Sequence, residues 1–294
     1  MFKLLLTTAI AVIFLWLAFA GVDFSAILGH SQEVGTAPIL FVGISVLVGT
    51  FLRSYRWTLL LSPLRVETEN PIGQFNAFYA VLMGYAVNIV LPRGGEVVRL
   101  LSISKTERLP WAGVLATMLI DRMLDIAALA ILLGITLYLL PSQTITALPG
   151  LANAGIVLIV AAIAGLCLLP HSGRIAQKGL ALAFVQRYVS SSVGDNLSEL
   201  AQQFDQGSGA LRNVARFPLI ALLSAMIWFT YWLNFYLMVV AFGLQDKITA
   251  IKCLIIFTIG SVGSLIPTPG SIGSIHYLVK IAAIETAKLS AEKA

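Results

Sequence analysis

The feature that most constrains this chain is a series of apolar segments, most of them long enough to cross a lipid bilayer as a helix. A transmembrane helix needs roughly 20 apolar residues in a row. The segments cover residues 4–20, 38–61, 73–91, 111–140, 152–169, 217–242 and 249–266, with a shorter one at 275–287. Charged residues make up 11% of the sequence, whereas a soluble domain carries about 25%. The sequence therefore predicts an all-α integral membrane protein, built as a polytopic helical bundle.

The residues outside these segments exclude several classes of function. The net charge of +5 comes from Lys and Arg in the loops, and no basic run interleaved with aromatics suggests nucleic-acid binding. Cys167 and Cys253 lie in apolar segments and are expected to be small core residues. The histidines (His30, His171 and His276) lack metal-ligand spacing, and HExxH, P-loop and GxSxG motifs are absent. We therefore expect no metal, no cofactor and no enzyme activity.

The N-terminus has two interpretations. Lys3, the apolar segment 4–20 and the small residues Ala18 and Ala20 before Gly21 resemble a cleavable secretory signal. The alternative is a retained first span with its N-terminus inside. We favour the retained span, because the apolar run reaches ~17 residues and the distribution of basic residues agrees with it.

The basic residues decide which segments cross the bilayer, because cytoplasmic loops are enriched in Lys and Arg. If every segment crosses, the basic clusters at 93–108 and 174–216 fall outside, and the uncharged loop 141–151 falls inside. If the third segment instead turns back at Pro92 and returns to the same side, all these clusters become cytoplasmic. Proline cannot continue a helix, and the glycines that follow permit a tight reversal. The sequence therefore predicts a re-entrant hairpin around 73–104.

A second interrupted segment predicts an opposed re-entrant hairpin around 255–285. The interrupting residues are Pro267, Pro269, Gly270 and Gly273. Paired, broken segments at matching positions indicate an inverted-repeat transporter, so the single domain 1–294 divides into a first half, 1–140, and an inverted second half, 150–294. Residues 281–294 are too short and too charged for a closing helix, which is either missing or degenerate.

The polar stretch 170–216 is expected to be a cytoplasmic connector between the halves. Apolar side chains recur within it at helical spacing, at Val193, Leu197, Leu200 and Phe204, with Asp195, Glu199 and Gln203 opposite. This pattern predicts an amphipathic helix on the inner membrane surface. A solvated connector is the alternative.

Four stretches carry a family resemblance. They are RSYRWTLLL (53–61), NIVLPRGGEVVRL (88–100), DRMLD (121–125) and PTPGSIGSIHYL (267–278). Together they resemble the lysylphosphatidylglycerol synthase/flippase transmembrane family, whose late motif more often has a Pro-Gly-Gly-Leu-Gly pattern followed by an acidic residue. Ser271, Ile272 and His276 stand in its place here. The soluble aminoacyl-transferring domain is absent from the sequence, so the resemblance implies lipid translocation and not lipid synthesis.

The charged residues of the first hairpin are the main candidates for substrate binding. Glu96 and Arg99 are i,i+3 neighbours that can pair, which leaves Arg93 at the tip with unused donors for a phosphate. The alternative is that these charges extend to the cytoplasmic interface. The full expected set is Arg93, Glu96, Arg99, Asn88, Gly94, Gly95, Arg53 and Arg56, with Asn88 capping the break or lining a cavity and the glycines letting the tip move.

Three charges inside an apolar segment form a second candidate group. Asp121 and Asp125 share a helix face at i,i+4, with Arg122 beside them. The trio is either a structural ion cluster that orients the hairpin arginines or a proton or cation coupling site.

Other polar and aromatic residues have more ordinary interpretations. Arg53 and Arg56, with Trp57, are expected to anchor a helix at the interface and, as an alternative, to meet lipid headgroups. His276 of the second hairpin is expected to be a packed polar residue and not a proton switch. The aromatic run of Trp228, Tyr231, Trp232 and Tyr236 is expected to face lipid or to pack between helices.

These observations favour a protein that flips a lipid phosphate between leaflets, with the headgroup at the hairpin tips. The partners expected are membrane lipids, either an anionic phospholipid or a polyprenyl phosphate, and a homo-oligomer or a lipid-modifying enzyme. The expected location is the inner membrane of a bacterium or archaeon. Two alternatives remain, namely a membrane enzyme that modifies a lipid phosphate with Asp121 or Asp125 as base, and an accessory subunit that gathers lipid for a partner enzyme.

Overall fold

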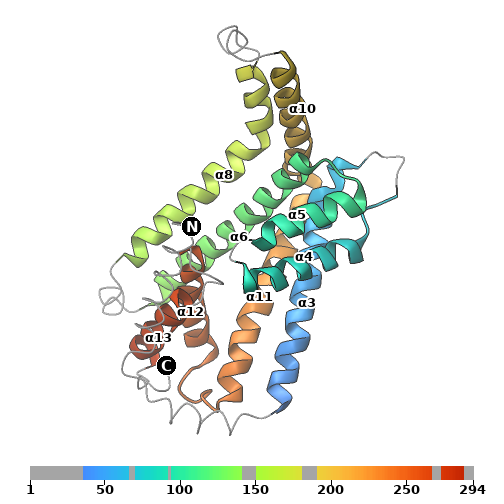
Figure 1. Cartoon of the computed structure of the whole chain (residues 1–294). Helices are drawn as coiled ribbons and strands as arrows, with labels where there is room; N and C mark the ends of the chain where they lie inside the picture. Colours follow the sequence, from blue (N-terminus) through green and yellow to red (C-terminus); the bar gives the residue numbers. More distant parts are fainter. Residues whose placement is uncertain are drawn as a thin grey trace.

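The computed structural model describes residues 36–65, 70–91, 94–140, 150–180, 191–266 and 273–287. Its α-helices are α3 (Thr36–Leu61), α4 (Gln74–Val90), α5 (Gly94–Glu107), α6 (Trp111–Leu139), α8 (Leu151–Leu180), α10 (Ser191–Ser208), α11 (Phe217–Ala241), α12 (Ala250–Val262) and α13 (Ser274–Ala287). Short 3-10 turns lie at Ser62–Leu64, Gly209–Arg212, Val214–Arg216 and Gly263–Leu265. The described part contains no strand, so the all-α prediction is confirmed (Figure 1). The predicted segment at 4–20 lies outside the described residues.

The helices are those of a membrane protein. Within the described ranges, three helical stretches are long and apolar enough to cross a bilayer, namely Ala37–Leu64, Leu151–Gly179 and Phe217–Ala241. Helix α6 is 29 residues long and just as apolar outside its charged trio. Many of the large apolar side chains on these helices are exposed, such as Leu40 on α3 and Val157 on α8, as expected for surfaces that face lipid.

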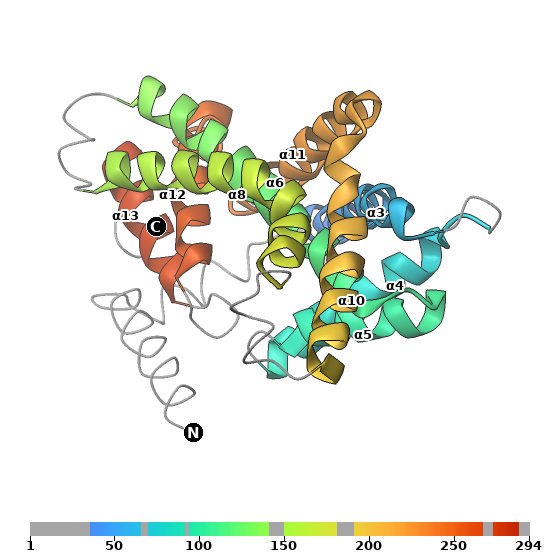
Figure 2. The same cartoon turned by 90° about the horizontal axis from the view of Figure 1, so that it is seen from above.

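Helices α4 and α5 form a tight antiparallel pair beside α3 (Figures 1 and 2). They meet at two glycines, since a Cβ on Gly95 would lie 2.0 Å from the carbonyl oxygen of Gly84. The amide of Gly95 donates to Oδ1 of Asn88 at 2.9 Å, which caps the start of α5. The chain therefore reverses between the end of α4 and Gly94, close to the predicted glycines. Pro92 and Arg93 lie outside the described residues.

The open end of this hairpin is held together by one buried carboxylate. Glu107, at the end of α5, is 8% exposed and pairs with Arg65, just past α3. It also accepts from the amide of Gly73 at 3.0 Å and from Nδ2 of Asn76 at 2.6 Å. The start of α4 and the ends of α3 and α5 are thus fixed at the same place.

Helices α12 and α13 form a second hairpin (Figures 1 and 2). The hydroxyl of Ser274 donates to the carbonyl of Gly263 at 2.8 Å, and Gly273 has a φ of +91° that favours glycine. The predicted interruptions Pro267, Pro269 and Gly270 lie outside the described residues.

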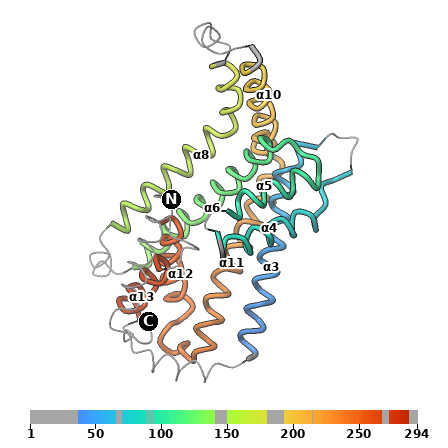
Figure 3. Tube along the Cα trace, in the orientation of Figure 1, coloured from blue at the N-terminus to red at the C-terminus, as the bar shows by residue number. Residues whose placement is uncertain are grey.

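The connector region differs from its prediction at its start. Helix α8 passes through Pro170 and continues to Leu180, and α10 packs along α8 and α6 (Figure 3). Beyond α10, Arg212 donates to Asp205 at 3.1 Å and to the carbonyl of Pro170 at 2.6 Å. The hydrogen bond from Arg212 lowers the pKa of Asp205. The amphipathic helix is confirmed, and its location at the inner membrane surface stays a prediction.

Two apolar clusters form the core, and α6 contributes to both. One surrounds Trp57 and Ile103 where α3, α4 and α5 meet the first part of α6. The other surrounds Leu133 and Ile256 where α8, α12 and α13 meet its last part. The charged trio of α6 therefore lies between the two clusters, where the two hairpins approach one helix.

Candidate functional site

A buried ion cluster joins the first hairpin to α3 and α6. Its centre is Asp121, which is fully buried. Arg56 on α3 donates to Oδ1 of Asp121 from Nε at 3.1 Å and from Nη2 at 2.8 Å. Arg53 and Arg99 both reach Oδ2 of the same carboxylate at 3.3 Å. The aspartate therefore holds guanidinium groups from two separate elements against α6.

The second carboxylate lies one helical turn further along α6. Asp125 accepts from Nη2 of Arg56 at 2.6 Å and also pairs with Arg53. Within the described ranges, three buried arginines therefore share two aspartates, and the cluster keeps one excess positive charge. A guanidinium stays charged when buried, so this excess attracts an anion.

Neutral groups complete the surroundings of the arginines. The guanidinium of Arg99 lies over the ring of Trp57, with Cζ 3.8 Å from the centroid, in a cation–π contact. The indole of Trp57 donates to Thr117 at 3.1 Å, and Arg56 donates to Ser224 on α11 at 2.8 Å. These contacts fix the arginines from several helices.

The prediction that Arg53, Arg56 and Trp57 anchor a helix at the membrane interface is wrong. Their exposed fractions are 5%, 0% and 0%. Arg53 and Arg56 lie on one face of α3, and that face turns toward α6. Burying a guanidinium is costly unless it is paired, and the paired carboxylates of Asp121 and Asp125 make the inward orientation possible.

The predicted pairing of Glu96 with Arg99 along α5 is also wrong. Glu96 pairs with Arg122 of α6, at side-chain exposures of 36% and 46%, while Arg99 turns inward to Asp121. The buried carboxylate attracts Arg99 more strongly, since the interaction of two charges grows as the effective dielectric constant falls. The prediction that an aspartate of the trio pairs with a hairpin arginine is confirmed by Arg99 and Asp121.

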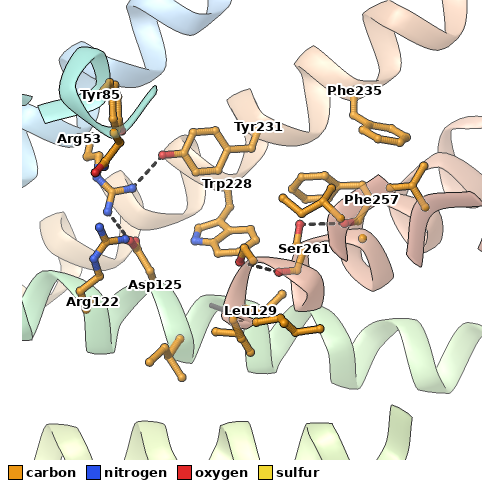
Figure 4. A pocket seen from close by; sticks show the side chains of 18 of the residues that line it. Arg53, Tyr85, Arg122, Asp125, Leu129, Trp228, Tyr231, Phe235, Phe257 and Ser261 are labelled. Atoms are coloured by element: carbon orange, nitrogen blue, oxygen red, sulfur yellow. Dashed lines mark hydrogen bonds and ion pairs between the residues drawn. The ribbon is translucent and has the colours of Figure 1, made fainter. Parts of the chain in front are cut away.

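A cavity of about 740 Å³ opens beside the ion cluster (Figure 4). One end is polar, and Nη1 of Arg53 donates there to the hydroxyl of Tyr231 at 2.9 Å. The polar lining consists of Arg53, Tyr85, Asn88, Glu96, Arg122, Asp125 and Tyr231. Asn88 therefore both caps the hairpin break and lines the cavity, as the sequence predicted.

The other end of the cavity is apolar and aromatic. Its walls come from α6, α11 and the second hairpin, and include Leu129, Trp228, Phe235, Phe257, Ile266, Ile275 and Val279. The hydroxyl groups of Ser261 and Ser264 line it too, and both donate to main-chain carbonyls of their own helix. The cavity is thus amphipathic, with its cationic end toward the first hairpin.

The structure brings most of the predicted residues together, with exceptions. Arg93 lies outside the described residues. Gly94 packs closely on Leu91 at the break. The prediction that His276 is a packed polar residue is wrong, since His276 is exposed and absent from the cavity lining. Its Nδ1 accepts from the backbone amide of Gly273 at 3.4 Å.

Sequence analysis missed several residues of the site. Tyr85 stands inside an apolar segment with no charged neighbour in the sequence, so no local signal marks it as part of the cavity. Trp228 and Tyr231 were expected to face lipid or to pack between helices. Trp228 does pack against the second apolar cluster, and both residues also line the cavity. Among the described residues, no group of three or more His, Cys, Asp or Glu side chains could hold a metal ion.

Comparison with known proteins identifies one relationship. The family model described as the lysylphosphatidylglycerol synthase TM region matches residues 4–294. No curated protein and no solved structure matches the chain.

Proposed function

The chain belongs to the lysylphosphatidylglycerol synthase transmembrane family, and on this premise we propose that it translocates an anionic phospholipid or a related lipid phosphate between the two leaflets. Membership of the family supports a lipid-related function in a membrane. The finer proposal rests on the ion cluster and the cavity.

The observation that carries the proposal is the excess positive charge of the cluster beside an amphipathic cavity. In the part of the chain that the structure describes, the carboxylates that pair with Arg53, Arg56 and Arg99 are those of Asp121 and Asp125. In a low-dielectric site an uncompensated charge strongly attracts a counter-ion. A lipid phosphate supplies an anion and an apolar chain together, which matches both ends of the cavity.

We assign different roles to the arginines. Arg53 and Arg122 line the cavity and would contact the phosphate. Arg56 and Arg99 are absent from its lining and would hold the carboxylates in place. We propose Arg93 as a further contact from the hairpin tip.

The arrangement of α4 and α5 supports a re-entrant hairpin. Glu107 ties the start of α4 and the end of α5 to the same end of α3, so the segment 73–104 would enter and leave on one membrane face. We propose that 255–285 forms its inverted counterpart, in a bacterial or archaeal inner membrane, with the N-terminus inside.

We propose transport and not catalysis. The carboxylates that line the cavity are Glu96, which pairs with Arg122, and Asp125, which pairs with Arg53 and Arg56. Asp121 is absent from the lining and accepts from Arg53, Arg56 and Arg99. The oxygens of both aspartates are thus occupied by guanidinium groups, and we assign them to holding the arginines in place.

The proposal can be tested with the purified protein in vesicles that contain a fluorescent phosphatidylglycerol. Bleaching by an impermeant reductant measures how much of the lipid reaches the outer leaflet. We expect flipping without nucleotide and in the presence of a metal chelator. Arg122→Ala should slow it, whereas Arg174→Ala, an exposed arginine outside the cavity, should not. No flipping above protein-free vesicles would reject the proposal.

A further inference from the structure

The two carboxylates that line the cavity, Glu96 and Asp125, are held in different ways. We propose that Glu96 is a built-in competitor of the ligand anion. Its carboxylate occupies Arg122, and an anion that enters the cavity takes its place and releases the start of α5 from α6. This inference rests on the anion site of the proposed function and concerns how that site is controlled.

Asp125 is the tightly held carboxylate of the two. Its side chain is largely buried, it accepts from Arg56 at 2.6 Å, and it also pairs with Arg53. Glu96 instead accepts from Arg122 through Oε1, in a pair that is open to solvent on both sides. Breaking a buried ion pair is costly, whereas an exposed pair contributes little. An anion in the cavity therefore displaces Glu96 and leaves Asp125 in place.

Arg122 is also the guanidinium that an entering anion can reach. Arg53 is buried and already donates to Tyr231 and to the aspartates of α6. Arg122 is exposed, and Figure 4 shows its side chain beside Asp125 at the polar end of the cavity. A guanidinium binds a phosphate with the same planar N–H groups that it offers to a carboxylate. The carboxylate of Glu96 and an incoming phosphate therefore compete for the same donors.

The place of Glu96 in the fold gives this competition a conformational effect. Glu96 lies in the first turn of α5, and its partner Arg122 lies on α6. Further along α5, Arg99 pairs with the buried Asp121, and Glu107 fixes the far end of the hairpin. Loss of the contact to Arg122 therefore frees the first turn of α5 and leaves the rest of the hairpin attached. Because such coupling is reciprocal, the contact weakens anion binding by the factor with which the anion weakens the contact.

Glu199 provides a matched control variant. It is an exposed glutamate on α10 that accepts from Gln203 of its own helix at 3.1 Å, and it is absent from the cavity lining. Glu199→Gln removes the same charge from the protein as Glu96→Gln does, without a change at Arg122. A difference between the two variants therefore reports on the place of the charge and not on the net charge.

The first test measures binding of dihexanoylphosphatidylglycerol to the purified full chain, with dihexanoylglycerol as a ligand that has the same acyl chains and no phosphate. We expect Glu96→Gln to tighten binding of the phospholipid about fivefold, the most that an exposed ion pair typically contributes. Glu199→Gln should leave it unchanged, and neither variant should change binding of dihexanoylglycerol.

The outcomes of this test separate the inference from the proposed function. Equal or weaker binding of the phospholipid to Glu96→Gln, or an equal gain for dihexanoylglycerol, would overturn the inference and leave the proposed function intact. No binding of the phospholipid to any of the proteins would overturn both.

The second test measures hydrogen exchange and needs no variant. A bound ligand ordinarily rigidifies its site, but dihexanoylphosphatidylglycerol should accelerate exchange in the first turn of α5 by about threefold or more. The last turn of α5, at Glu107, should stay unchanged. In Glu96→Gln the first turn should exchange at the faster rate with or without the lipid. Slower or unchanged exchange in the first turn of the unmodified chain at saturating lipid would overturn the inference, even if Glu96→Gln does not fold.

Discussion

The two helical hairpins use the same backbone device and different chemistry. Each brings its arms together at glycine, with Gly95 against Gly84 in α4–α5 and Gly263 against Ser274 in α12–α13. The first hairpin sends Arg99 into a buried ion cluster. The second contributes mainly apolar side chains and serine hydroxyls to the cavity.

The two hairpins are therefore held in place by different interactions. The position of α4–α5 is specified by charge, because its buried arginine requires the carboxylates of α6. The position of α12–α13 is specified by packing on the apolar cluster around Ile256. The comparison therefore predicts that changes of charge damage the first hairpin far more than equivalent changes damage the second.

The largest effect is expected from Asp121→Ala. The change leaves Arg53, Arg56 and Arg99 with Asp125 alone, and breaking a buried ion pair typically costs about 3–5 kcal/mol. The matched change in the second hairpin is Ser274→Ala, which removes another fully buried polar group and should cost about 1 kcal/mol. Thermal unfolding in detergent measures both.

The double variant Arg99→Ala with Asp121→Ala sharpens the same test. Removing both charges should destabilise the protein less than the two single losses added together, with a coupling of about 0.5–3 kcal/mol. The same cycle with Asp125 should show weaker coupling, because the structure pairs Arg99 with Asp121. Additive losses in both cycles would show that the hairpin is not held by this ion pair.

Most of the helices could be predicted from the sequence, because apolar run length fixes a membrane helix. The segment 217–242 corresponds to Phe217–Ala241, and 38–61 to Thr36–Leu61. The prediction failed at Pro170, where the connector was expected to begin but α8 continues. A proline costs the helix one hydrogen bond, but close packing of Gly173 on Asp205 of α10 holds α8 together beyond it.

The site was less predictable, because its partners are distant in the sequence. Arg56 lies 65 residues before Asp121, and near the end of an apolar run it has the pattern of an interfacial anchor. Nothing local distinguishes a buried arginine from a snorkelling one. The pairing of Asp121 with a hairpin arginine was predictable, since a carboxylate deep in an apolar helix needs a cation.

A smaller loss of stability than that of Asp121→Ala is expected at the glycine contacts of both hairpins. Gly95→Ala would place a Cβ 2.0 Å from a carbonyl oxygen, and Gly263→Ala would place one 2.8 Å from the backbone nitrogen of Ile275. Neither backbone can move without opening its hairpin, and overpacking costs about 1–3 kcal/mol. We expect Gly95→Ala to lower the melting temperature more. The reverse order would mean that the second hairpin is the more rigid one.

A smaller effect is expected at the base of the first hairpin. Glu107→Gln keeps the side-chain shape but removes the charge that pairs with Arg65, for a loss of about 1–2 kcal/mol. Hydrogen exchange should accelerate at the backbone amide of Gly73, which donates to this carboxylate. Exchange in α12–α13 should stay unchanged, and a rise there would show that the two hairpins unfold together.

The smallest effect on stability is expected at Glu96 and Arg122, the exposed pair at the cavity wall. Exposed ion pairs contribute about 0–1 kcal/mol, so Arg122→Ala should hardly change the melting temperature. It should nevertheless slow lipid flipping, since Arg122 lines the cavity. A control is needed, because a loss of flipping could also come from a loosened contact between α5 and α6.

The exchanged pair, Glu96→Arg with Arg122→Glu, separates these two causes. It keeps the bridge between α5 and α6 and the net charge, and it moves the cation from α6 to the first hairpin. If the bridge alone matters, flipping should recover in the exchanged pair. We expect it not to recover, because a phosphate held by Arg53 and Arg122 depends on where the second guanidinium stands. Full recovery would show that the first hairpin needs only its attachment to α6, and would leave Arg53 as the cavity's sole described phosphate contact.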